Sequence, residues 1–196
     1  MRHPALTILR DEHQALAAML RSIPLLLAQA RRDGVPPDFN ALRAMLFYID
    51  EFPERHHHRL ESELLFPRLA ERAPQLRDTI QKLEQDHAQG EQRVRELAHA
   101  LAAYELLGAS RREAFEQAVQ RYVDFYLAHM RVEEQSLLPM AEQVLEPADW
   151  AALDAAFTRH QDPLAGGAAP DDYQALFTRI VHLVPAPLGL GPATVL

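Results

Sequence analysis

Apolar side chains recur at intervals of three or four residues along four long segments of the chain. The first segment shows the pattern at Leu6, Leu9, His13, Leu16, Leu20, Ile23 and Leu27. Such spacing aligns one stripe of side chains along a helix and turns it toward a core. The segments are also rich in Ala, Leu, Glu, Gln and Arg, which favour helices. Helices are therefore predicted over residues 5–31, 38–70, 75–106 and 111–145.

Short clusters rich in Gly, Pro and polar residues separate these segments, at residues 32–37, 71–74 and 107–110. Asp38 and Ser110 are predicted to cap the helices that follow them, because their side chains can accept hydrogen bonds from free backbone N–H groups. Pro24 and Pro53 fall inside segments and predict a kink or an interruption there. Four long helices with short connections predict an all-α, up-down-up-down four-helix bundle over residues 1–145.

The last quarter of the chain, residues 146–196, has a different pattern. Residues 147–150 begin a short helix with proline near its first position. Residues 162–167 have the composition of a loop, and residues 171–183 predict a last short helix before an end rich in Pro and Gly. We interpret this part as a helical extension packed on the bundle, not as a second domain.

The composition is that of a soluble globular protein, since 48% of the 196 residues are hydrophobic and 24% are charged. The absence of cysteine excludes disulfides, thiolate zinc sites and iron–sulfur clusters held by cysteine. A net charge of −8 argues against binding to nucleic acid or to an anionic membrane surface. No apolar run approaches the roughly 20 residues of a membrane span, and the N-terminus lacks a secretory signal, so a cytoplasmic location is expected.

Ten histidines are many for this length, and each predicted helix carries one of them on or near its inward stripe. These four are His13, His57, His87 and His129. On the second and fourth helices a glutamate follows four residues later, which pairs His57 with Glu61 and His129 with Glu133. Residues four apart lie on one face of a helix, so each of these helices offers an imidazole and a carboxylate to the same point.

This inward polar set predicts a metal site in the bundle core. Two buried carboxylates without partners would destabilise the fold, and metal ions remove that penalty by neutralising them. Nitrogen and oxygen ligands without sulfur disfavour a structural zinc site and suit a pair of iron ions, with manganese as the second choice. The metal-free alternative is an interaction bundle, which requires that the same residues hydrogen-bond one another.

A second ligand scheme is also open. Glu54 with His57 and Glu84 with His87 each match the ExxH motif of ferritin-like di-metal bundles. That scheme gives no role to the histidines of the first and fourth helices, so it ranks below the first. Loss of iron on mutation of Glu54 and Glu84 would favour it.

The register of His56-His57-His58 is decided here by the acidic residue at i+4, which only His57 has. His56 and His58 are therefore predicted to lie outside the set of metal ligands. Tyr122 and Tyr126 share the stripe of the fourth-helix histidine and are predicted to be core residues with satisfied hydroxyls. The other histidines are assigned to surface or structural roles: His3, His99, His160 and His182.

The order H…HxxxE…H…HxxxE resembles that of the hemerythrin-like (HHE cation-binding) proteins over residues 5–145. The flanks that share the likeness are residues 52–61, 65–67, 129–134 and 137–139. The tail resembles a longer bacterial subgroup with a C-terminal extension. The resemblance implies a hemerythrin-like bundle with two iron ions, held as follows: His13 and His57 on one, His87 and His129 on the other, and Glu61 and Glu133 bridging them.

One departure from the oxygen-carrying hemerythrins bears on function. Those proteins have a second histidine one turn away on the third helix, where this chain has Leu83 and Glu91. Either Glu91 is an extra ligand or the second iron has one more open position, which favours redox reactivity with O₂, peroxide or NO. The expected function is binding or sensing of O₂, NO or iron, and the alternative is a di-iron enzyme with peroxide-consuming or oxidase activity. The sequence assigns neither catalytic residues nor an oligomeric state.

Overall fold

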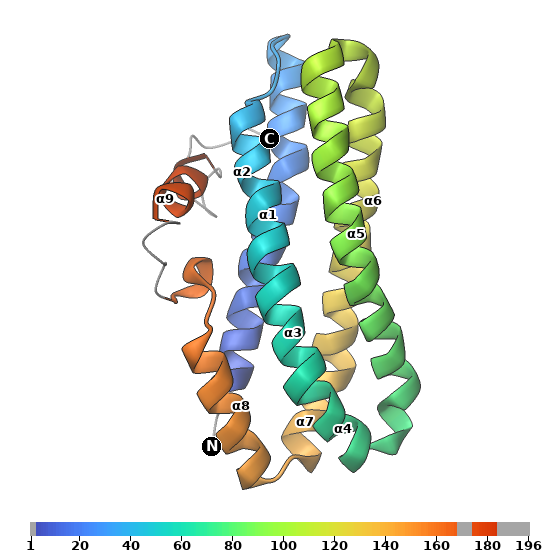
Figure 1. Cartoon of the computed structure of the whole chain (residues 1–196), viewed down its shortest axis with the longest axis vertical. Helices are drawn as coiled ribbons and strands as arrows, with labels where there is room; N and C mark the ends of the chain where they lie inside the picture. Colours follow the sequence, from blue (N-terminus) through green and yellow to red (C-terminus); the bar gives the residue numbers. More distant parts are fainter. Residues whose placement is uncertain (1–2, 168–173, 184–196) are drawn as a thin grey trace.

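The computed structural model describes residues 3–167 and 174–183, and every regular element in these ranges is a helix. Four long helical rods lie side by side and alternate in direction (Figure 1). The first rod is α1 (Pro4–Asp33) and the third is α5 (Arg77–Leu107). This arrangement confirms the predicted all-α bundle.

The second and fourth rods are built from several helical pieces in direct succession. The second consists of α2 (Phe39–Ile49), η1 (Asp50–His57), α3 (His58–Leu60), η2 (Glu61–Leu65) and α4 (Phe66–Arg72). The fourth consists of α6 (Arg112–Val132), η5 (Glu133–Leu137) and α7 (Leu138–Val144). Here η1, η2 and η5 are π-helical, and the rods are joined by the 3₁₀ turns η3 (Pro74–Leu76) and η4 (Gly108–Arg111).

The π turns η2 and η5 begin at a glutamate and precede a proline. In η2 the backbone N–H of Phe66 donates to the carbonyl of Glu61, and in η5 the N–H of Leu138 donates to the carbonyl of Glu133 in the same way. Pro67 and Pro139 follow one residue later. Proline has no N–H and its ring clashes with the carbonyl one turn earlier, so a wider turn lets each rod continue through it. The same device places the two glutamates at matching points of the two rods.

The other two helix prolines differ in their effect. Pro53 lies inside η1, where its carbonyl accepts the N–H of His58, so the predicted interruption takes the form of a wide π segment. Pro24 lies inside α1, which continues through it to Asp33 without ending.

One predicted cap is confirmed and the other is wrong. Asp38 accepts the N–H of Ala41 at 2.9 Å and caps α2. Ser110 lies within η4, where its hydroxyl donates to the carbonyl of Leu107, and α6 begins only at Arg112. The third rod passes straight into a 3₁₀ turn, so Ser110 is not at the start of the next helix.

The bundle core consists of two apolar clusters with a polar layer between them. On α1 one cluster ends at Leu9 and the other begins at Leu16, and on α5 the corresponding residues are Leu83 and Val94. Buried polar residues of both helices fall in this gap: Glu12, His13, Asp86 and His87. The apolar clusters therefore separate the polar layer from both ends of the bundle.

The C-terminal part contains α8 (Pro147–Arg159), η6 (Pro163–Ala165) and α9 (Gln174–Leu183). Helix α8 lies along α1, and α9 lies beside α2 (Figure 1). The Trp150 indole stacks on the His3 ring with centroids 4.0 Å apart, and Asp154 accepts the N–H of Ala5 at 2.9 Å. The predicted last helix is present over residues 174–183, whereas residues 171–173 and the Pro/Gly-rich end lie outside the described residues.

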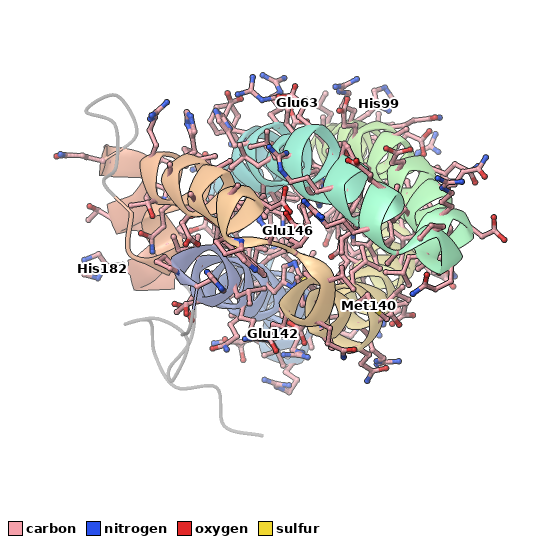
Figure 2. The ribbon with its side chains drawn as sticks, turned by 90° about the horizontal axis from the view of Figure 1, so that it is seen from below. Glu63, His99, Met140, Glu142, Glu146 and His182 are labelled. Carbon is pink, nitrogen blue, oxygen red and sulfur yellow. The ribbon has the colours of Figure 1, made fainter. Side chains whose placement is uncertain are left out.

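The histidines expected at the surface lie away from the core. His99 and His182 are exposed and point outward when the bundle is seen from its end (Figure 2). His160 is also exposed, and His3 is partly buried against α8. Across the described residues, no helix combines the length and the apolarity that crossing a membrane requires.

Candidate metal centre

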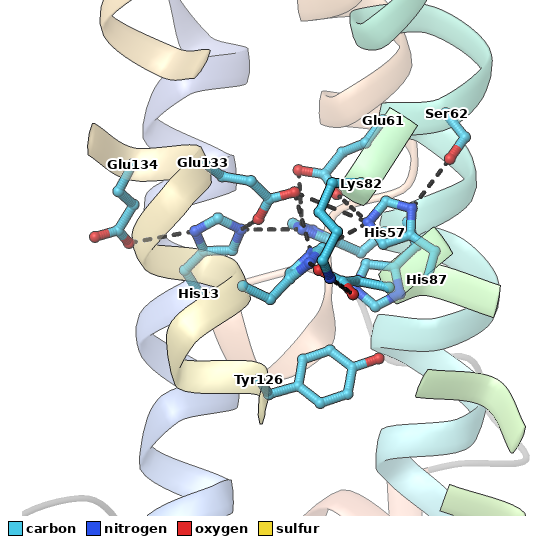
Figure 3. Close-up of polar contacts among 12 residues, drawn as sticks. His13, His57, Glu61, Ser62, Lys82, His87, Tyr126, Glu133 and Glu134 are labelled. Atoms are coloured by element: carbon cyan, nitrogen blue, oxygen red, sulfur yellow. Dashed lines mark hydrogen bonds and ion pairs between the residues drawn. The ribbon is translucent and has the colours of Figure 1, made fainter. Parts of the chain in front are cut away.

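The polar layer brings together the six residues that the sequence singled out, one or two from each rod. They are His13 of α1, His57 of η1, Glu61 of η2, His87 of α5, His129 of α6 and Glu133 of η5. All six are buried, and Glu61 and Glu133 are 0% and 1% exposed. Figure 3 shows five of these side chains converging on one small region between the rods: His13, His57, Glu61, His87 and Glu133.

The histidine rings meet in pairs through their Nε2 atoms. His13 Nε2 lies 3.2 Å from His57 Nε2, and His87 Nε2 lies 3.2 Å from His129 Nε2. Imidazole nitrogens that face one another so closely can share a proton or bind a common cation. The two pairs define two nitrogen-lined positions within the layer.

Each glutamate extends across both positions. Glu61 lies 3.4 Å from His57 Nε2 through Oε1 and 3.6 Å from His87 Nε2 through Oε2. Glu133 lies 3.3 Å from His13 Nε2 through Oε2 and 3.2 Å from His129 Nε2 through Oε1. One oxygen of each carboxylate therefore faces each nitrogen pair, which is the arrangement that two bridging carboxylates require.

His58 also lies in this layer, although the sequence predicted it outside the set of metal ligands. The residue is 3% exposed, and a ligand atom of His58 lies within 4.8 Å of ligand atoms of both His87 and His129. Its ring stacks on His87 with centroids 4.1 Å apart. The i+4 rule missed His58 because its acidic partner, Glu54, precedes it by four residues. The widened π segment that ends at His57 also brings two consecutive side chains toward the core.

The structure decides against Glu91 as an extra ligand. Its side chain is 45% exposed and accepts a hydrogen bond from Arg95 at 3.0 Å. Leu83, the other position considered on the third helix, lies in the apolar core. The further imidazole beside His87 comes from His58 of the second rod.

The ferritin-like ligand scheme also fails. Glu84 is exposed on α5 and takes no part in any of the His and carboxylate groups found in the described part of the chain. Glu54 is buried, but its oxygens hydrogen-bond to His58, Tyr122 and Tyr126. The interpretation of both tyrosines as core residues with satisfied hydroxyls agrees with these contacts.

Four of the five histidines in the layer have an oxygen in hydrogen-bond contact with Nδ1. The distances are 3.2 Å for His13–Glu134, 2.6 Å for His57–Glu12, 3.1 Å for His58–Glu54 and 3.1 Å for His87–Ser62. The fifth, His129, has no hydrogen bond at Nδ1 within the described residues, and its nearest carboxylate there, Asp86, lies 3.8 Å away. An oxygen on Nδ1 favours a proton there and leaves the Nε2 lone pair free to bind a metal. These neighbours were not predicted from the sequence, although Glu12 and Asp86 each directly precede a candidate histidine.

Charges in the layer depend on one another. Burial alone would lower the pKa of His57, but carboxylates nearby, Glu61 foremost, raise it well above its usual value. Burial also opposes the charged form of His129, yet Glu133 raises its pKa. Conversely, burial would raise the pKa of Glu133, but His129 and the other imidazoles hold it well below its usual range. In the metal-free protein, protons on the imidazole rings therefore neutralise the carboxylates, as bound metal cations could do.

Hydrogen bonding within the protein does not account for the two glutamates. Among the described residues, none donates a hydrogen bond to either oxygen of Glu61 or Glu133, although all four atoms are fully buried. Buried carboxylate oxygens are normally hydrogen-bonded, so four such atoms facing imidazole nitrogens fit a bound metal better than a metal-free network. The donors are nitrogen and oxygen only, a set that suits iron, manganese or zinc.

Comparison with protein families agrees with this geometry. The model of the hemerythrin HHE cation-binding domain matches residues 5–141, which include His58 and the six residues that the sequence singled out. The chain belongs to the hemerythrin HHE family. Searches of curated proteins and of solved structures give no significant match. The match confirms the resemblance seen in the sequence, and metal binding by this hemerythrin-like bundle accords with its clustered histidines and glutamates.

Proposed function

We propose that this hemerythrin-like protein binds two non-heme iron ions in its polar layer and uses them to bind or sense a small molecule such as O₂ or NO. The observation that supports this most directly is the pair of buried carboxylates, Glu61 and Glu133, whose oxygens have no hydrogen bond within the described residues and face both nitrogen groups. In this proposal His13 and His57 hold one ion. His58, His87 and His129 hold the other.

The two positions differ in a way that favours binding of an outside ligand. One position has three histidines and the other has two, while both share the two glutamates. The ion beside His13 and His57 thus has fewer protein donors and is where we expect a diatomic ligand to bind. When bound, the iron pair would supply reversible changes of oxidation state and this open position.

The protein's own groups prepare the layer for such a ligand. Oxygen partners on Nδ1 hold the imidazole rings in one orientation, so little rearrangement is needed when metal binds. The apolar clusters above and below limit the entry of water. Iron is the first choice and manganese the second, because both accept mixed imidazole and carboxylate ligands.

A di-iron enzyme, peroxide-consuming or oxidase in type, is the second candidate. The observation in its favour is the buried pair Tyr122 and Tyr126, whose hydroxyls both donate to Glu54, which in turn contacts His58. A tyrosine side chain that is linked by hydrogen bonds to a metal-binding histidine, here through Glu54, can exchange electrons and protons with a redox centre.

The decisive experiment is metal content per chain, with optical spectra recorded before and after exposure to air. We expect about two irons per wild-type chain and loss of most iron in His57→Ala and His129→Ala. The matched control is His99→Ala, because His99 is exposed on the third rod and should leave iron content unchanged. Failure to take up iron or manganese on anaerobic reconstitution would overturn the proposal and favour a metal-free interaction bundle. Rapid, repeated consumption of added peroxide would favour the enzyme.

A further inference from the structure

The C-terminal extension reaches the polar layer through Glu12. The Glu12 carboxylate is buried, with Oε2 at 2.6 Å from His57 Nδ1 and Oε1 accepting the backbone N–H of Asp162 at 2.7 Å. The two hydrogen bonds use one carboxylate oxygen each. A residue 150 positions away in sequence thus completes the shell of a candidate metal ligand.

Asp162 is held in place by a network of its own. Its side chain accepts the Tyr48 hydroxyl at 2.7 Å through Oδ2 and the N–H of Leu164 at 2.7 Å through Oδ1. Its carbonyl accepts the N–H groups of Ala165 and Gly167, both at 2.9 Å. Every polar group of this residue, 7% exposed overall, therefore has a partner, and its N–H is fixed in direction.

The turn after Asp162 is tight and requires glycine at two positions. A Cβ built on Gly167 would lie 2.0 Å from the carbonyl oxygen of Gln161, so only glycine fits there. Gly166 adopts a φ of +98°, which side chains rarely take. The N–H that Glu12 accepts therefore belongs to the first residue of a closely packed, hydrogen-bonded turn.

Of the five histidines in the layer, His57 is the one whose partner is held by the extension. The oxygen partners of the other four come from the bundle itself: Glu134, Glu54, Ser62 and Asp86. Only Glu12 is also bonded to a residue after the bundle, among the contacts of the described residues. The extension therefore acts on the two-histidine position and not on the three-histidine position.

We propose that the loop of Asp162 is a positioning element of the metal centre, which holds Glu12 and through it the ring of His57. The inference rests on the proposed function, because it concerns the ion bound by His13 and His57. A carboxylate bonded to Nδ1 orients the ring and raises its basicity as a ligand. Without the Asp162 N–H, one oxygen of a buried carboxylate has no donor, and Glu12 turns toward another partner or water.

A series at position 162 separates the N–H from the side chain. Asp162→Asn keeps both the N–H and an acceptor for Leu164, Asp162→Ala keeps only the N–H, and Asp162→Pro removes both. Proline suits the local backbone, because φ at this residue is −61°. Glu12→Gln alters the carboxylate that lies between Asp162 and His57. Asp149→Asn is the control, because Asp149 anchors α8 to Arg72 without touching Glu12.

The first readout is the dissociation constant of each iron, measured anaerobically by competition with a chelator. Removing the residue that hydrogen-bonds to a metal-binding side chain typically weakens metal binding about 10- to 100-fold. Because Asp162 acts one step further away, we expect Asp162→Pro to weaken one of the two ions about tenfold relative to Asp162→Ala. Asp162→Asn and Asp149→Asn should match wild type, and Glu12→Gln should show the larger loss.

The second readout is the Nδ1 proton resonance of His57 in metal-free protein, recorded by NMR and assigned by its loss in Glu12→Gln. A proton shared with a carboxylate resonates far downfield, and we expect Asp162→Pro, but not Asp162→Ala, to shift it. Circular dichroism checks that each variant folds. If Asp162→Pro does not fold, the iron dissociation constants of Glu12→Gln and Asp149→Asn are compared instead.

Equal iron affinities and equal His57 resonances across the series would overturn the inference while leaving the iron site intact. Wild-type protein that binds no iron would instead overturn the proposed function, and a shift of the His57 resonance would then show a structural link only.

Discussion

His57 and His58 are consecutive in the chain, yet they belong to different halves of the polar layer. Their ring centroids lie 5.6 Å apart and their planes differ by 70°. His57 faces His13, whereas His58 groups with His87 and His129. A π segment ending at this pair gives the second rod a nitrogen in each half. Replacing one of the two histidines should therefore affect one ion more than the other.

We predict that His58→Ala lowers the iron content from about two to about one per chain. The three-histidine position loses a donor, while the ion beside His13 and His57 keeps its full set of protein ligands. The measurement is iron per chain after anaerobic loading and gel filtration. His56→Ala is the matched control, because His56 hydrogen-bonds the backbone carbonyl of Glu51 through Nδ1 at 2.6 Å and stacks on the ring of Phe52. Unchanged iron in His58→Ala would remove His58 from the site.

Gly90→Ala should destabilise the protein, although alanine favours helices by about 1 kcal/mol over glycine. A Cβ on Gly90 would lie 2.8 Å from Glu54 Oε1 and 2.9 Å from Tyr126 Cζ, with the Tyr126 hydroxyl closer still. Overpacking of this kind costs about 1–3 kcal/mol. The measurement is urea unfolding of the metal-free protein. Adding Tyr126→Phe removes the closest clash, so the double variant should recover part of the loss; a more stable Gly90→Ala would contradict the close packing.

Glu61→Leu should weaken metal binding and also destabilise the metal-free protein. Glu61 lies 3.4 Å from His57 Nε2 and raises the pKa of His57, so the variant leaves a buried imidazole without the carboxylate that balances its charge. Removing one partner of a buried ion pair typically destabilises by about 3–5 kcal/mol. Iron-loaded wild type should be more stable still than iron-treated Glu61→Leu, because binding to the folded state adds about 2.7 kcal/mol per site at 100 times the Kd. Thermal unfolding with and without iron measures both effects; a metal-free variant as stable as wild type would contradict the pairing of Glu61 with His57.

Asp162 should make the stability of the metal-free protein depend on pH. Burial raises the pKa of Asp162 from 3.8 to about 6, against the hydrogen bonds from Tyr48 and Leu164 that lower it. A carboxyl whose pKa is higher in the folded state favours folding when protonated, so this contribution is complete below about pH 4 and is lost as the pH rises through about 6. The difference is up to about 3 kcal/mol. Urea unfolding between pH 4 and 8 should show that Asp162→Asn gains stability relative to wild type as the pH rises; a constant difference would contradict the raised pKa.

The family, the four helical rods and the placement of six polar residues in one layer could be predicted from the sequence. Apolar residues that recur every three or four positions indicate which face of each helix turns inward. The pairs His57–Glu61 and His129–Glu133 are spaced at one helical turn. These are local relationships along a single helix, so they need no knowledge of how the helices meet.

Tertiary structure alone decided the rest. His58 enters the layer because a π segment changes the angle between neighbouring side chains, which the i+4 rule does not contain. Glu91 turns outward to Arg95, and Glu12 is bonded to Asp162 from the far end of the chain. Such contacts depend on the register of helices against one another and on the path of the extension. Hydrophobic spacing fixes neither, because it records which side of a helix is buried and not which residues it meets there.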